Sequence, residues 1–153
     1  MIVGVIGAGQ MGAGMAQVSA GAGHDVLLSD IDLGRAEAGK SGIAKALGRL
    51  VAKDKMTQGD ADALLARITP VADHSAFAPA GLVIEAATER EEIKRAIFAS
   101  VGPHLSAAAI LASNTSSIPI TRLAQASPDP ARFIGVHFFN PVPVMGLVEL
   151  IRG

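Results

Sequence analysis

A histidine, a glutamate and a serine in the second half of the sequence have side chains suited to acid–base chemistry. His137 ends an apolar run, and Glu149 lies in the next apolar run. A histidine with a carboxylate behind it is the usual arrangement of a general base, because the carboxylate selects the ring tautomer and stabilises the imidazolium. Oxidation of a secondary alcohol needs such a base for the hydroxyl proton, and the Ser116 hydroxyl could hold the same oxygen. The spacing fits a structural histidine in a turn at least as well, so both interpretations stay open here.

A glycine-rich turn near the N-terminus has the pattern G-x-G-x-x-G and consists of Gly7, Ala8, Gly9, Gln10, Met11 and Gly12. In dinucleotide-binding domains the first glycine permits a tight turn, the second lets the backbone approach a pyrophosphate, and the third lets helix and strand pack closely. The helix start then offers free N–H groups and a positive dipole end to the phosphates. Because this turn follows an apolar run and opens a helical segment, we expect a dinucleotide site. A glycine-rich turn in an unrelated α/β domain is the alternative.

Asp30 follows this turn by about 20 residues, at the end of the second apolar run, which is the position of the acidic residue in such sites. Its carboxylate would accept hydrogen bonds from ribose hydroxyls and repel a 2′-phosphate. Two like charges about 4 Å apart cost on the order of 4 kcal/mol at an intermediate dielectric. The expected cofactor is therefore NAD rather than NADP, although Arg35 offers some compensation for a phosphate.

Strands and helices alternate along the whole chain. Apolar runs predict strands at Ile2–Ile6, Val26–Ser29, Leu82–Ala86, Ala109–Ala112, Phe133–His137 and Val148–Ile151. Helical spacing predicts helices at Gln10–Ala22, Leu33–Ala52, Asp60–Arg67, Glu89–Val101 and Pro119–Gln125. This alternation predicts one Rossmann-type domain over residues 1–153, with a doubly wound, mainly parallel α/β sheet and helices on both faces.

Polar residues follow several of the predicted strands, where ligands bind in open α/β sheets. They are Glu85, Glu89 and Lys94 after one strand, the run Ser113–Ser117 after the next, and His137 with Asn140 after the third. Runs of Ser, Thr and Asn usually form caps or turns, so the second cluster has an ordinary structural interpretation as well. The remaining histidines, His24, His74 and His104, lie in loop-like segments and are interpreted as surface residues.

Charge and composition exclude several classes of function. The formal net charge is −1, which does not fit a nucleic-acid-binding protein with its basic surface. No apolar run reaches the roughly 18 residues of a membrane span. With no cysteine, the chain has no disulfide, thiolate nucleophile or zinc–thiolate site, and we predict no metal. The first residues lack the features of a secretory signal, so we expect a cytoplasmic protein.

Four segments of the sequence resemble the L-3-hydroxyacyl-CoA dehydrogenase family: GVIGAGQMGAGMAQ, VIEAATE, ASNTSSIPIT and HFFNPVPVMGLVELIRG. The bacterial 3-hydroxybutyryl-CoA dehydrogenases are the most similar group within it, and the resemblance covers essentially the whole chain. It implies NAD-dependent oxidation of a 3-hydroxyacyl-CoA, with His137 as the catalytic base, Glu149 as the acid that orients it, and Ser116 bound to the 3-oxygen. This resemblance raises His137 from a possible base to the expected one.

The same resemblance implies further binding residues. The expected cofactor-binding set is Gly7, Gly9, Gln10, Met11, Gly12, Asp30, Glu89, Lys94 and Asn114. The expected acyl-CoA-binding set is Ser116, Asn140, Lys53 and Lys55, and a solvated basic turn is the alternative for the two lysines. The family also implies a homodimer.

Two departures from the family pattern bear on activity. Family members continue into an all-helical domain that completes the acyl pocket, whereas this chain ends at Gly153, so we expect NAD binding but poor turnover from it alone. Gly146 stands where many relatives have lysine. The alternatives to the dehydrogenase are an NAD-binding or structural module without catalysis, and a dehydrogenase of another hydroxy acid.

Overall fold

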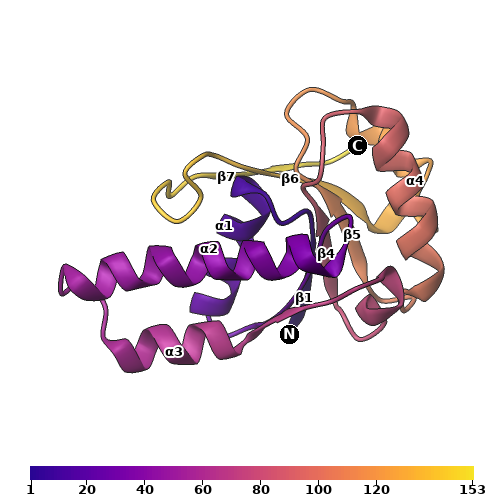
Figure 1. Cartoon of the computed structure of the whole chain (residues 1–153). Helices are drawn as coiled ribbons and strands as arrows, with labels where there is room; N and C mark the ends of the chain where they lie inside the picture. The colour runs from indigo at the N-terminus through magenta and orange to yellow at the C-terminus, as the bar shows by residue number, and fades with distance from the viewer.

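The structure, a computed structural model, describes all residues from Met1 to Gly153. Its sheet contains seven strands in the order β3-β2-β1-β4-β5-β6-β7 (Figure 1). In chain order these strands are β1 (Ile2–Ile6), β2 (Asp25–Ser29), β3 (Ile68–Pro70), β4 (Leu82–Glu85), β5 (Ile110–Ser113), β6 (Phe133–Phe138) and β7 (Val148–Ile151). All neighbouring pairs are parallel except β6 and β7. The predicted doubly wound, mainly parallel sheet is confirmed.

Five α-helices connect the strands: α1 (Gln10–Gly21), α2 (Leu33–Ala52), α3 (Gln58–Ala66), α4 (Glu91–Val101) and α5 (Ile120–Ala124). Short 3₁₀ turns lie at His74–Phe77, Gly102–His104 and Pro130–Arg132. Side-chain caps set two of the helix starts: the Asp32 carboxylate accepts from Arg35 N at 2.8 Å, and the Thr57 hydroxyl accepts from Asp60 N at 3.1 Å. No helix is long and apolar enough to cross a membrane.

The helices cover both faces of the sheet with two separate apolar cores. Residues of α1, α2 and α3 pack on one face, and residues of α4 and α5 pack on the other with Phe77. Successive strand residues point to opposite faces, so Val83 joins the second core while its neighbour Ile84 joins the first. Buried on both sides, these strands need continuous apolar runs, and this is why the sequence reveals them.

The strand β3 was not predicted from the sequence. It has only three residues, Ile68–Pro70, and pairs with β2 at the edge of the sheet. Proline has no N–H to donate and occurs in sheets mainly at such edges, so Pro70 in the sequence argues against a strand. A segment of three residues is also too short to show a strand pattern.

The start of α4 also differs from the prediction, since the helix begins at Glu91 and leaves Glu89 in the preceding loop. There the Glu89 carboxylate is free to bond to another loop instead of lying along a helix face.

The chain reverses direction across the sheet between β1 and β4. From β1 it builds outward through β2 and β3, then returns to add β4, β5 and β6 on the other side of β1. The carboxyl ends of β1 and β4 therefore border the crevice in which ligands bind in doubly wound folds. The glycine turn follows β1 at this position.

Candidate functional site

The conformation of the glycine turn between β1 and α1 requires residues without a side chain at Gly7 and Gly12. Gly7 has φ +110°, and a Cβ there would lie 2.7 Å from the Ala86 carbonyl. A Cβ on Gly12 would lie 1.6 Å from the Gly7 carbonyl oxygen. Gly9, in contrast, has no heavy atom within 4 Å of its ideal Cβ position, and as the N-cap of α1 it supplies no side-chain cap. The first N–H groups of α1, at Gln10 and Met11, are thus open to an anion in front of Gly9.

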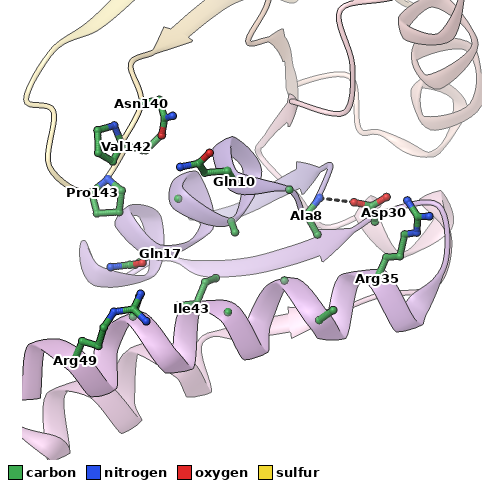
Figure 2. Close-up of a pocket in the computed structure, with 18 residues that line it drawn as sticks. Ala8, Gln10, Gln17, Asp30, Arg35, Ile43, Arg49, Asn140, Val142 and Pro143 are labelled. Carbon is green, nitrogen blue, oxygen red and sulfur yellow. Dashed lines mark hydrogen bonds between the residues drawn. The ribbon is translucent and has the colours of Figure 1, made fainter.

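Asp30 is held against this turn by the backbone. One carboxylate oxygen accepts from Ala8 N at 2.7 Å and the other from Ile31 N at 2.6 Å (Figure 2). Each oxygen keeps a second lone pair for a ribose hydroxyl. Figure 2 also places Arg35 beside Asp30, where a cation could meet a phosphate.

Gly7, Gly9 and Asp30 line a cavity of 790 Å³ that continues along the loop after β4 and over α4. Its size and its mixed apolar and polar lining suit the adenosine half of a dinucleotide. His74 lines the same cavity and is half-buried, with Nδ1 2.7 Å from the Ser100 hydroxyl. Burial, the larger cause, and the nearby His104 lower the pKa of His74 below its usual 6.5.

His74 thus lies at the surface, as expected, but its side chain also lines the cavity beside Asp30. Its loop approaches Asp30 only through the tertiary fold, and no local sequence pattern could have indicated this.

A second cavity, of 630 Å³, lies between α1 and α2 (Figure 2). The loop after β6 closes one side of it through Asn140, Val142 and Pro143. Small residues of α2, such as Gly39 and Gly42, line it together with the polar side chains of Gln10, Gln17, Asp30, Arg35, Arg49 and Asn140. It is a groove that begins at the glycine turn and extends along α2.

The candidate base lies on the other side of the crevice. His137 and Glu149 face each other across the antiparallel pair β6–β7, with His137 Nδ1 3.8 Å from Glu149 Oε2. The two side chains are 22% and 51% exposed, so the pair remains accessible to a ligand. The ring of Phe139 lies 4.6 Å from the imidazole ring, centroid to centroid, and packs against it at a tilt of 56°. With Nδ1 directed at the carboxylate, Nε2 is the nitrogen that can act on a substrate.

Ser116 lies at the tip of a turn that Glu89 ties down on both sides. One oxygen of Glu89 accepts from Thr115 Oγ1 and from Ser117 Oγ, each at 3.0 Å. The Ser116 hydroxyl itself is exposed and makes no hydrogen bond within the chain. The structure thus positions this serine and leaves its hydroxyl available.

Lys94 is buried beneath this turn in an ion pair. Its side chain is 1% exposed, and its ammonium lies 2.6 Å from Glu85 Oε1 and 3.7 Å from Glu89 Oε1. Ser113 Oγ, at 3.3 Å, is its third partner. The cofactor-binding role expected for Lys94 stays a prediction. In the structure its ammonium group links α4 to β4 through Glu85 and to β5 through Ser113.

The two lysines expected at the CoA end are separated from the other site residues. Lys53 is the C-cap residue of α2, Lys55 lies two residues further along the chain, and both are exposed. A helix of 20 residues is about 30 Å long, so these lysines lie at the end of α2 that is far from Asp30, past Arg49. Gly146 is exposed, with no heavy atom within 4 Å of its Cβ position, so nothing in the chain explains a glycine there.

The glycine turn, the uncapped start of α1, the anchored Asp30 and the adjoining cavity together define a dinucleotide-binding domain of the Rossmann type. The residues present fit NAD, because the turn lacks the side chains that would block a pyrophosphate and a carboxylate stands at the ribose position.

Sequence comparison identifies the family. Residues 2–153 match the family described as "3-hydroxyacyl-CoA dehydrogenase, NAD binding domain", and the chain belongs to this family. It is 51% identical over 153 residues to a probable 3-hydroxybutyryl-CoA dehydrogenase of Deinococcus radiodurans, covering 100% of this chain and 55% of that protein. It is 46% identical to the 3-hydroxyadipyl-CoA dehydrogenase of Escherichia coli, covering 99% of this chain and 32% of that protein.

Structural comparison agrees. The crystal structure of (S)-3-hydroxybutyryl-CoA dehydrogenase from Ralstonia eutropha matches with a TM-score of 0.96 and 45% identity, over 99% of this chain and 54% of that one. The predicted family and the predicted NAD-binding domain are confirmed. The chain spans about half the length of these 3-hydroxybutyryl-CoA dehydrogenases.

Proposed function

We propose that the protein carrying this chain oxidises an (S)-3-hydroxyacyl-CoA, such as 3-hydroxybutyryl-CoA, to the 3-oxoacyl-CoA with NAD⁺. The observation that carries the proposal is the His137–Glu149 pair across β6 and β7, on a domain of an NAD-binding dehydrogenase family. A scaffold that only bound NAD would have no need of a histidine and a carboxylate facing each other beside an exposed serine hydroxyl.

The proposed chemistry divides between this chain and its cofactor. Bound NAD⁺ supplies the hydride acceptor. Nε2 of His137 takes the proton of the 3-hydroxyl as the carbon–oxygen bond becomes a carbonyl, and Glu149 stabilises the resulting imidazolium. The Ser116 hydroxyl holds the same oxygen and keeps it within reach of the histidine. In the reverse direction His137 returns the proton to the 3-keto oxygen.

The groove in Figure 2 is the proposed path of the CoA portion. It extends from the glycine turn past Asn140 and along α2 to Arg49. Beyond Arg49, Lys53 and Lys55 are exposed and could meet the phosphates of CoA. Cations on a solvated helix end bind phosphate mainly by charge, so binding there should weaken as salt rises.

Replacing the base tests the proposal. His137→Gln should lower acetoacetyl-CoA-dependent NADH oxidation by roughly 100- to 10,000-fold, the usual contribution of a general base. Its affinity for NADH should stay unchanged, since His137 lies across the crevice from the glycine turn. His24→Gln is the matched control, because His24 is also partly exposed but lies before β2, at the opposite end of the strands. Normal turnover by the His137 variant would contradict the mechanism.

Substrate comparison separates the remaining functions. Turnover of 3-hydroxybutyryl-CoA but not of free 3-hydroxybutyrate supports the CoA-dependent reaction. The reverse result favours a dehydrogenase of another hydroxy acid, and NADH binding without turnover of either favours a binding module. These assays need the protein at the length its gene encodes, because this chain alone is expected to bind NAD and turn over poorly.

The homodimer and the cytoplasmic location expected from the sequence stay predictions, and the exposed surface of this chain adds a further one. Val144, Leu147 and Leu150, in the loop after β6 and in β7, are 77%, 55% and 70% exposed, and we expect such a surface to associate. Gel filtration of this chain at high concentration should show more than a monomer, and a clean monomer would refute this. The homodimer expected of the gene-length protein and its cytoplasmic location are tested by ultracentrifugation and cell fractionation.

A further inference from the structure

The strands β5 and β6 separate before they reach the reaction centre. Their pairing ends at Ser113 and Gly135, whereas β6 continues to Phe138 and pairs there only with β7. His137 therefore lies on a part of β6 that has no strand neighbour on the β5 side. Such a segment can shift relative to the rest of the sheet unless another group holds it.

Asn114, the residue after β5, supplies the missing connection. Its backbone N–H donates to the Glu85 carbonyl at 2.9 Å and so extends the pairing with β4. Its side-chain Oδ1 accepts from Phe138 N at 2.9 Å. Because the partner is an N–H donor, the amide must present its oxygen there, and Nδ2 makes no hydrogen bond within the chain. One residue thus joins β4, β5 and the end of β6.

The hydrogen bond lies between the two groups expected to hold the substrate oxygen. Ser116 is two residues beyond Asn114, in the turn that Glu89 ties down through Thr115 and Ser117. His137 directly precedes Phe138 and faces Glu149. The Asn114–Phe138 hydrogen bond is therefore the side-chain link between the serine turn and the histidine strand.

We propose that Asn114 is a positioning residue, whose side-chain oxygen sets the separation between Ser116 and His137 by holding the Phe138 N–H. This inference rests on the proposed dehydrogenase function for its catalytic consequence. The structural part of the inference, that this hydrogen bond orders the end of β6, does not depend on the proposed function. It differs from a role in which Asn114 only contacts the cofactor, because in that case the Phe138 amide would not depend on the side chain.

Two substitutions separate the alternatives. Asn114→Leu keeps the number and branching of the side-chain heavy atoms but has no acceptor, whereas Asn114→Asp keeps an acceptor oxygen at the same place. Hydrogen exchange at the Phe138 amide, followed by NMR on this chain, should be roughly 3- to 10-fold faster in the Leu variant, as expected for the loss of one hydrogen bond. In the Asp variant it should stay close to the original rate. An unchanged Phe138 exchange rate in the Leu variant would overturn the inference, whatever the activity.

Kinetics on the gene-length protein supply the second measurement. The Leu variant should lose kcat on the order of 100-fold, the effect of displacing a reacting group by about 1 Å, with the KM for NADH unchanged. The Asp variant should recover most of this loss. A rise in the KM for NADH with kcat unchanged would assign Asn114 to cofactor contact and overturn the positioning role. If the unsubstituted enzyme shows no turnover, the proposed function fails while the exchange result still decides the inference.

Discussion

Gly9 and Gly12, two glycines of the same turn, should respond in different ways to an added methyl group. In Gly12→Ala the new Cβ would lie 1.6 Å from the Gly7 oxygen and 2.7 Å from the Gly7 carbon. Both are backbone atoms, so the turn must open and α1 must move from β1. Overpacking of this kind costs about 1–3 kcal/mol, occasionally more, and we expect at least this loss in the free energy of unfolding.

Gly9→Ala should behave in the opposite manner. No heavy atom lies within 4 Å of the new Cβ, and the backbone at φ −71° and ψ −168° accepts alanine. The cost is the weaker N-cap, about 1 kcal/mol or less. The methyl group would nevertheless occupy the space that the pyrophosphate needs, so affinity for NADH should fall sharply while the fold persists.

Gly48→Ala is the matched control for both changes. Gly48 lies in α2, exposed, with no heavy atom within 4 Å of its Cβ position. Alanine is the better helix former there, so the free energy of unfolding should rise by about 0.5–1 kcal/mol with NADH affinity unchanged.

Urea unfolding followed by circular dichroism measures the stability of each variant, and NADH emission measures binding. The chain has no Trp and no Tyr, so NADH is titrated without a background from them. NADH binding by Gly9→Ala at the original affinity, or unfolding of Gly12→Ala at the original urea midpoint, would refute these expectations.

Three further predictions concern charged groups. Asp30→Ser removes the negative charge at the expected ribose position and leaves Arg35 in place. The ratio of NADPH affinity to NADH affinity should therefore rise at least about tenfold, which corresponds to about 1.4 kcal/mol. An unchanged ratio would reject the assignment of Asp30 to the ribose. Lys94→Met leaves the Glu85 carboxylate buried without its cationic partner and should lower the free energy of unfolding by about 3–5 kcal/mol. Adding Glu85→Gln should recover part of this loss. A loss below about 1 kcal/mol for Lys94→Met would show that the ion pair is not needed for stability. Burial lowers the pKa of His74 in the folded state below its ordinary value of 6.5. The contribution of the neutral ring to stability is therefore complete above pH 6.5 and is lost as the pH falls below that value. Between pH 8 and pH 5 the unfolding temperature should fall less steeply in His74→Asn than in the original chain. Parallel curves for the two proteins would contradict the last prediction.

Most of the fold could be predicted from the sequence because buried parallel strands and their helices have strong local patterns. The predicted strands Ile2–Ile6 and Val148–Ile151 coincide with β1 and β7, and the other predicted strands end within one residue of the observed ones. The errors in the predicted elements, at β3 and at the start of α4, also have local causes. β3 is too short and too weakly patterned to recognise, and α4 starts late because Glu89 bonds to the Ser116 turn instead of joining the helix.

The site could be predicted only where residues meet through a single turn or a single strand pair. Gly7, Gly9 and Gly12 lie within one turn, and His137 faces Glu149 across one antiparallel pair. The His74 position in the Asp30 cavity could not be predicted, because it depends on how separate loops meet at the edge of the sheet.

By itself the sequence determined the alternation of strands and helices, the glycine turn with its acidic partner, and the resemblance to a dehydrogenase family. These are local properties, set by apolar periodicity, by the absence of side chains at given positions and by residue identity. The tertiary structure decided which polar groups share an environment: that Glu85 and Lys94 form a buried pair, that Glu89 holds the serine turn, and that Asn114 bonds to the strand of His137. These contacts join residues on different strands, helices and loops. They form because the carboxyl ends of the parallel strands β4, β5 and β6 meet at one edge of the sheet.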